Sequence, residues 1–294
     1  MTNDSAISRV KGRGLLLGLR LGAVGATLAA AAVMSLPSGA LSAHGAAHEL
    51  GYRGDPAGVK AASSGGNLID NGGRVLASSN TYAIWWGPSS AWASDVQTGV
   101  ATFFNGLNGS TLLGIGQQYM RTTPISSSYA GNKSDSSAPP RKVSPSTLGN
   151  EVQKLYGTTV DPNGIYFVFT SNFPKGGGFC AWHSYANVGG TSIAVAYMPN
   201  TTGVAGCNPG TTSQTSTQSE GLASLVNVTS HEFMEAITDA LPGSSTGAWT
   251  DSSGSEIGDK CAWNFGPTAV QLANGSYWQL QKEWSNAVSG CVAG

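Results

Sequence analysis

Hydrophobic and polar positions follow two different spacings along this chain. Residues 81–87 are mainly aromatic or β-branched and stop before Pro88, which predicts a strand. In residues 91–107 the apolar positions recur every three or four residues, which predicts an amphipathic helix ending at Asn108-Gly109. Residues 165–170 are apolar without interruption, as in a central strand buried on both faces. Strands and helices therefore share one hydrophobic core.

The C-terminal half predicts a hairpin and then a long helix. Residues 181–185 and 191–197 form two strand-like runs, and a helix follows at 222–238. Further on, residues 272–280 suggest a second hairpin within an aromatic, loop-rich tail.

Between the first helix and the central strand, the Ser- and Pro-rich composition of residues 126–145 predicts a surface loop. Residues 148–156 are expected to form a short helix. The fold class predicted is α+β, with a mixed sheet.

The N-terminal residues have the features of an export signal. Four basic residues surround an apolar run at 15–34, and small residues follow, so residues 1–43 are interpreted as a signal peptide cleaved after Ala40 or Ala43. An uncleaved anchor is the alternative, and the only contact with a membrane that we expect. Residues 44–73 read as a flexible arm or propeptide, and 74–294 as a single domain.

Charge excludes two classes of partner. Four of the 15 basic residues and one of the 16 acidic residues precede residue 44, which leaves 11 basic against 15 acidic residues. Nucleic acids and anionic membranes require a basic surface. Neither is therefore expected as a partner of the mature chain.

All four cysteines lie in the C-terminal half, and an exported chain is expected to pair them as disulfides. Pairing of nearest neighbours, Cys180 with Cys207 and Cys261 with Cys291, is our prediction among three possible connectivities. These bonds would stabilise the aromatic C-terminal region, and they favour a secreted, extracellular protein.

Acidic residues accumulate where basic residues are missing. Residues 176–259 contain seven acids and no lysine or arginine. Clustered carboxylates without a counter-charge repel one another, and a bound metal ion is the simplest partner. In the expected helix, His231 and Glu235 are one turn apart and face the same side, with Glu232 beside them. A solvated acidic face on this helix is the alternative.

This segment resembles the H-E-x-x-H helix of the zincin metallopeptidases, with glutamate as the second ligand. The resemblance implies Glu232 as the general base and His231, Glu235 and a downstream acid as ligands. Glu256 would be that third ligand and Asp259 would orient the first histidine, or the two roles are exchanged. The expected fold is thus α+β with a zincin-like active-site helix.

Other ligands and ions stay open. His183, in the first hairpin, is a less favoured ligand, and a hydrogen-bonded structural histidine is its alternative role. Zinc is the expected ion, but an oxygen ligand at position 235 also admits Ca²⁺ or another divalent cation. A calcium loop at Asp251, Ser253 and Ser255 is a minor alternative that does not fit the EF-hand pattern.

A second resemblance covers residues 75–262. The motifs Tyr-Ala-Ile-Trp-Trp-Gly at 82–87, Phe-Cys-Ala-Trp-His at 179–183 and Glu-Ala-Ile-Thr-Asp at 235–239 occur in the order seen in the exordium, or phosphate-induced protein 1, family. That resemblance implies a secreted, cell-wall-associated protein.

Two functions follow as hypotheses. The first is a secreted zinc metallopeptidase that acts on a peptide or protein, with strand 191–197 pairing with the extended substrate. The second is a non-catalytic, exordium-like extracellular protein with a structural ion and aromatic contacts to cell-wall carbohydrate. A serine hydrolase has little support, since the chain has no Gly-x-Ser-x-Gly elbow between a strand and a helix.

Overall fold

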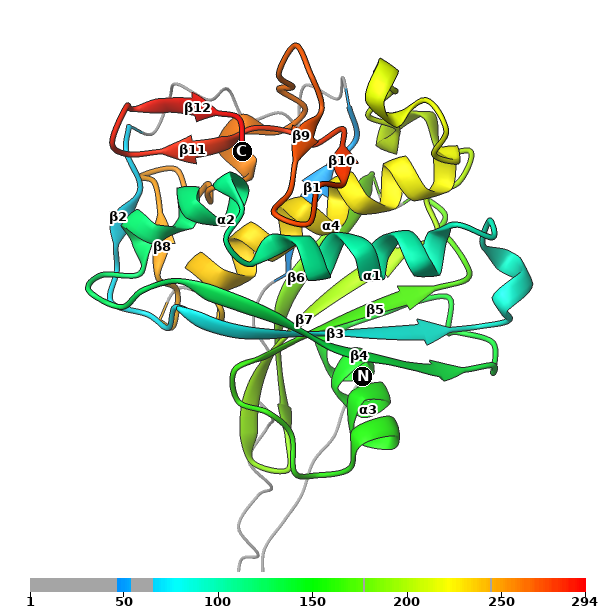
Figure 1. Ribbon diagram of the computed structural model, residues 1–294. Coiled ribbons are helices and arrows are strands. Elements are labelled where there is room, and N and C mark those ends of the chain that lie inside the picture. The colour runs from blue at the N-terminus through cyan, green and yellow to red at the C-terminus, as the bar shows by residue number, and fades with distance from the viewer. Residues whose placement is uncertain (1–46, 54–65, 177, 244) are drawn as a thin grey trace, which may run out of the picture. The chain divides into compact units, whose positions relative to one another are not determined.

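A six-stranded mixed sheet organises the protein. The computed structural model describes residues 47–53, 66–176, 178–243 and 245–294 (Figure 1), so the predicted signal peptide lies outside the described residues. The strand order is β1-β6-β7-β5-β3-β4, in which β4, β3, β5 and β7 are parallel while β6 and β1 are antiparallel to their neighbours. The strands are β1 (His48–Gly51), β3 (Ser78–Trp86), β4 (Ser126–Asp135), β5 (Gly164–Thr170), β6 (Phe179–Val188) and β7 (Thr191–Pro199).

Helices cover both faces of the sheet. In Figure 1, α1 and α4 lie on one face and α3 on the other, which agrees with their contacts to the strands. The helices are α1 (Val96–Leu107), α2 (Thr111–Gly116), α3 (Pro145–Tyr156) and α4 (Glu220–Thr238). Short 3-10 helices are η1 (Ser89–Ala91), η2 (Gln117–Tyr119), η3 (Ala205–Cys207), η4 (Ser213–Thr215) and η5 (Asp259–Cys261). The predicted α+β class with a mixed sheet is confirmed.

Successive side chains of the central strands point to opposite faces of the sheet, so each face has its own hydrophobic core. In β3, Ala83 and Trp85 belong to the core beneath α1 and α4, while Ile84 and Trp86 belong to the core beneath α3. Successive side chains of a strand point to opposite faces, so an uninterrupted apolar run suits a strand covered on both sides. Every residue of β5 is buried, as predicted.

The long helix α4 is enclosed along its length. Ser219 caps its start, with its side-chain oxygen accepting a hydrogen bond from the Leu222 amide and donating one to Asp95 at 2.6 Å. All residues of the helix after the exposed Glu220 are buried. The acids in its second half are therefore not a solvated face.

The C-terminal region is built from short antiparallel pairs. They are β2 (Ile69–Asp70) with β8 (Trp249–Thr250), β9 (Val270–Gln271) with β10 (Tyr277–Trp278), and β11 (Glu283–Ser285) with β12 (Gly290–Val292). The pair β9–β10 is the predicted second hairpin. Both disulfides join the nearest neighbours in sequence, as predicted: Cys180 with Cys207 and Cys261 with Cys291. Such bonds form in oxidising compartments.

The N-terminal segment predicted as a flexible arm or propeptide contains residues that belong to the core. Strand β1 pairs with β6, and Leu50 and Leu68 are buried in the main hydrophobic cluster. These parts of residues 44–73 are packed against the domain, because the exposed edge of β6 supplies backbone partners that the sequence does not reveal.

Two further expectations need correction. Residues 126–135 form β4 and not a loop; the strand lies at the edge of the sheet and only Ser127 in it is buried, so it carries no hydrophobic alternation. The strand at 191–197 is not available to a substrate, because β7 is hydrogen-bonded to β5 on one side and to β6 on the other.

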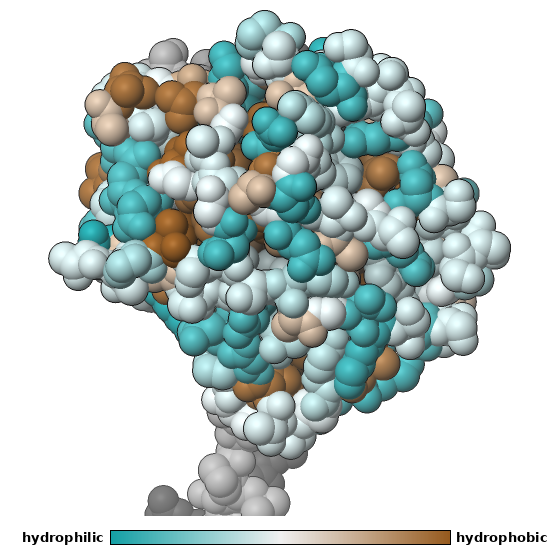
Figure 2. Space-filling model, viewed as in Figure 1, coloured by the Kyte–Doolittle hydropathy of each residue, from teal (hydrophilic) through white to brown (hydrophobic). Residues whose placement is uncertain are grey.

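On the face shown in Figure 2, hydrophilic and neutral residues predominate, and hydrophobic residues form small separate patches. Only 11% of the chain is charged, so neutral polar side chains provide much of this surface. Within the described part of the chain, no helix combines the length and apolar character needed to span a membrane.

A buried glutamate on α3 leads to a prediction about pH. Burial raises the pKa of Glu151 to about 7, and the neighbouring Asp135 carboxylate adds to the effect. Between pH 4.5 and 7 the unfolded chain loses this proton while the folded chain retains it, so stability falls as the pH rises. We expect Glu151→Gln to gain on the order of 2 kcal/mol of unfolding free energy relative to wild type between pH 4 and pH 8.

Chemical unfolding of chelator-stripped wild type and variant at pH 4, 6 and 8 measures this difference. A difference that is constant with pH would contradict the assignment of the titration to Glu151.

Candidate metal centre

Residues from separate segments meet beside α4. The helix contributes His231, Glu232 and Glu235, and β6 contributes His183. Glu256 comes from the loop that leads into η5, and Asp259 is the first residue of η5. The structure thus brings all six predicted residues into one cluster, and every one except Asp259 is fully buried.

His183 is the residue around which carboxylates gather. Its Nδ1 lies 3.3 Å from Glu232 Oε2 and 3.2 Å from Glu235 Oε2, and its Nε2 lies 3.7 Å from Glu256 Oε1. Neither nitrogen has a partner in hydrogen-bond geometry among the described residues. A buried polar group without such a partner is costly, and a metal ion would satisfy it.

Glu235 connects the two buried histidines. Its Oε2 faces His183, and its Oε1 lies 3.0 Å from His231 Nε2 while accepting a hydrogen bond from the Asp259 amide at 3.1 Å. The carboxylate is therefore held by two elements. Close approach of η5 depends on Gly258, whose missing Cβ would lie 2.6 Å from His231 Nδ1.

The other ring nitrogen of His231 is occupied. Its Nδ1 lies 2.8 Å from Gln281 Nε2, and this amide nitrogen also donates to the Gly258 carbonyl at 3.0 Å. The amide group must donate here, so Nδ1 accepts and a neutral ring carries its proton on Nε2. A cation on Nε2 would require the proton on Nδ1 and rotation of the amide. Neither ring nitrogen of His183 has such a constraint among the described residues.

Three combinations of residues bring ligand atoms within 4.8 Å of one another among the described residues. They are His183, Glu235 and Glu256; His231, Glu235 and Asp259; and His48, Glu256 and Asp259. The predicted ligand set of His231, Glu235 and Glu256 is not one of them. His231 and Glu256 belong to different groups, and the group that contains both Glu235 and Glu256 includes His183.

Sequence reasoning missed three members of the cluster. His48 on β1 was assigned to the arm, Asp239 just after α4 received no role, and Glu283 on β11 was overlooked in the aromatic tail. Glu283 is fully buried, and neither of its oxygens has a hydrogen-bond partner in the described part of the chain. The sequence feature that could have identified Glu283 is a charged residue in a short strand, Glu283–Ser285.

Electrostatics reflect the crowding of carboxylates. Burial raises the pKa of Glu232 to about 7 against the opposing effect of His183, and it raises the pKa of Glu256 and Glu283 well above their usual range. The pKa of Glu235 is lowered, because His231 and His183 outweigh its burial. Burial alone would lower the pKa of His183, but Glu256 and the other carboxylates raise it well above its ordinary value.

Lysine does not neutralise this cluster. The buried Lys260 pairs with Asp251 at 2.8 Å and lies over the Trp284 ring. Asp251 also accepts hydrogen bonds from Ser253 and Ser255, so it closes a local turn. The residues of the minor calcium-loop hypothesis are therefore engaged with one another and with Lys260, and Asp251 is buried and not a surface charge.

A cleft reaches the cluster from the surface. It has a volume of about 440 Å³ and is lined by His48 and Asp239 together with Gly247 and Thr250 among others. His48 is 22% exposed at its side chain, whereas His183 and Glu232 are at 0%. Solvent and small molecules therefore meet the cluster first at His48.

Comparison with protein-family models, curated proteins and solved structures finds no match to this chain. Fold and site together define an α+β protein with a buried histidine–carboxylate cluster that opens to a cleft.

Gly258 provides a test of this geometry. We expect Gly258→Ala to destabilise the protein by about 1–3 kcal/mol, since the new methyl group would overlap His231 and crowd Glu235. Zinc affinity should fall at least tenfold as the support of Glu235 is displaced. Chemical unfolding and zinc titration of the stripped protein measure both effects.

Gly114→Ala is the matched control. This helical glycine in α2 has no atom within 4 Å of an added Cβ, so its replacement should leave zinc affinity unchanged and stability equal or slightly higher. Equal behaviour of the two variants would contradict the close approach at Gly258.

Proposed function

We propose that the protein is a secreted, metal-dependent hydrolase of the zinc metallopeptidase type. The observation that carries the proposal is His183, a fully buried histidine that has no partner in hydrogen-bond geometry among the described residues and is surrounded by Glu232, Glu235 and Glu256 at 3.2–3.7 Å. No lysine or arginine of the described residues forms an ion pair with these carboxylates. Nitrogen and carboxylate donors in this combination suit zinc.

His183, Glu235 and Glu256 would hold the ion. His231 then acts as a positioning residue, since its Nε2 lies 3.0 Å from Glu235 while its Nδ1 is fixed by Gln281. Partners of this kind orient ligands and are as important as the ligands. The ion would act as a Lewis acid toward the scissile carbonyl and lower the pKa of a water molecule.

Glu232 is assigned the role of general base. Its carboxylate lies 3.3 Å from His183, beside Glu235, and neither oxygen has hydrogen-bond geometry to a described residue. It would remove a proton from the attacking water and return it to the leaving amine. The placement of base and ligand on one helix is the zincin-like feature of the site. A peptide would enter through the cleft at His48, since β7 is enclosed.

The alternative is a non-catalytic extracellular protein, such as the exordium-like resemblance implies. Complete burial of His183, Glu235 and Glu256 favours it, because structural metal sites are closed whereas catalytic ones keep a position open to substrate. In that case the ion would stabilise the fold, and surface aromatics such as Tyr277, which is 37% exposed, would contact carbohydrate.

Metal binding is tested by stability. Zinc added to chelator-stripped protein at 1,000 times its dissociation constant should raise the unfolding free energy by about 4 kcal/mol. His183→Ala should remove this gain, because a ligand is lost. Zinc content by mass spectrometry and chemical unfolding are the measurements. An unchanged stability of the wild type with zinc would refute both the hydrolase and the structural-ion function.

Glu232→Gln separates the two functions. The variant should retain zinc but hydrolyse unfolded casein at least a hundredfold more slowly than wild type, because the amide cannot accept the proton. Glu220→Gln, an exposed acid at the start of the same helix, is the control and should keep full activity. Equal rates of hydrolysis in both variants would contradict the peptidase mechanism. Absence of hydrolysis by zinc-loaded wild type would favour the structural ion.

A further inference from the structure

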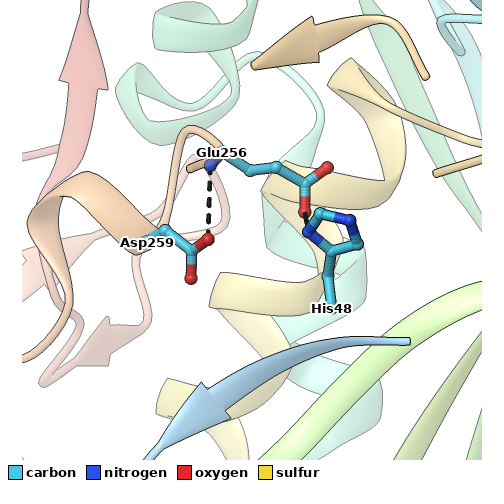
Figure 3. Close-up of side chains that lie close together, drawn as sticks. All are labelled: His48, Glu256 and Asp259. Atoms are coloured by element: carbon cyan, nitrogen blue, oxygen red, sulfur yellow. Dashed lines mark hydrogen bonds and ion pairs between the residues drawn. The ribbon is translucent and has the colours of Figure 1, made fainter. Parts of the chain in front are cut away.

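We propose that the centre holds two divalent cations, the second bound by His48, Glu256 and Asp259 at the mouth of the cleft. This inference rests on the proposed metal-dependent function and extends it to a dinuclear site. Figure 3 shows His48, on β1, against the Glu256 carboxylate, and Asp259, the first residue of η5, against the Glu256 backbone amide; one possible ligand atom of each residue lies within 4.8 Å of the others.

Strand pairing places His48 at the cluster. In the register of β1 with β6, His48 lies directly opposite His183, so both side chains project from the same face of the sheet. The two ring centroids are 5.8 Å apart. A histidine from the N-terminal segment thereby becomes a neighbour of the buried histidine.

Glu256 occupies the position of a bridging carboxylate. Its Oε2 lies 2.7 Å from His48 Nδ1, and its Oε1 lies 3.7 Å from His183 Nε2. One oxygen therefore faces the histidine of the outer group and the other faces the histidine of the inner group. A carboxylate used in this way holds two cations about 3.5–4 Å apart, as in two-metal hydrolases.

The number of buried carboxylates is sufficient for more than one dication. Glu232, Glu235, Glu256 and Glu283 are all fully buried, and Asp239 is 1% exposed. Glu283 approaches from the side opposite β6, on strand β11, and neither of its oxygens has a hydrogen-bond partner among the described residues. One divalent cation balances two of these charges, whereas two cations balance four.

Exposure distinguishes the two positions. The inner group of His183, Glu235 and Glu256 is entirely buried, whereas His48 and Asp259 are partly exposed and His48 lines the cleft. Catalytic metal sites keep coordination positions free for water or substrate. The outer cation is therefore the one that a substrate entering the cleft would meet, and the inner cation is the enclosed one.

Zinc stoichiometry tests the inference. Chelator-stripped wild type, dialysed against zinc and analysed by mass spectrometry, should carry two zinc ions per chain, and His48→Gln should carry one. Asp259→Asn, which alters the same site from a different element, should also carry one. With Mn²⁺ in place of zinc, the wild type should give a spin-coupled electron paramagnetic resonance spectrum that His48→Gln loses, because the coupling requires two bridged ions.

Glu49→Gln is the matched control, since Glu49 is the exposed neighbour of His48 on β1 and should leave two zinc ions. Chemical unfolding of the stripped variants verifies that they fold. If His48→Gln does not fold, the zinc content of Asp259→Asn decides the outcome. One zinc ion in both wild type and His48→Gln would overturn the second site and leave the proposed function standing. Two zinc ions in both would also overturn it, whereas no zinc in the wild type would overturn the proposed function as well.

Discussion

Buried negative charge is the constraint on which the rest of this structure depends. Four glutamates, Glu232, Glu235, Glu256 and Glu283, are removed from water around two buried histidines, and no described lysine or arginine forms an ion pair with them. The desolvation of unpaired carboxylates costs several kcal/mol each, so the folded state must be compensated by protons or by cations. Protonation of the carboxylates would leave several O–H donors and oxygen acceptors packed against one another. Cations suit the cluster better, because histidine nitrogens and carboxylate oxygens that converge are metal-ligating atoms.

Enclosure of α4 explains why the charges are so deeply buried. The sheet covers one side of the helix, and the segment from Glu256 to the C-terminus covers the other, where the Cys261–Cys291 disulfide ties η5 to the last strand. Gly258 allows this segment to touch His231, and Gln281 fixes the ring from the same side. Lys260, the buried lysine of the described residues, is held by Asp251 and Trp284 and so forms no ion pair with these glutamates.

Local patterns in the sequence were sufficient for the framework of the site. The helix α4, the β6–β7 hairpin and both disulfides follow from periodicity, turn residues and cysteine spacing, and the helical spacing of His231 and Glu235 identifies the acidic centre. His48 could not be found in this way. Its strand has four residues in a glycine- and alanine-rich segment, and its strand character comes from pairing with β6, far along the chain. Polar β4 was missed for the same reason, since an edge strand with exposed side chains has no hydrophobic period.

The choice between the two buried histidines shows where a local motif stops being informative. His231 and Glu235 are one helical turn apart, so the sequence alone favours His231 as a ligand. The hydrogen bond between its Nδ1 and Gln281 comes from the C-terminal region and sets the proton on Nε2, which opposes binding of a cation there. His183 comes from a strand and has no ligand at helical spacing to mark it in the sequence, yet its two nitrogens face three carboxylates without hydrogen-bond geometry. The helix therefore supplies Glu232 and Glu235 to the cluster, and the sheet supplies His183.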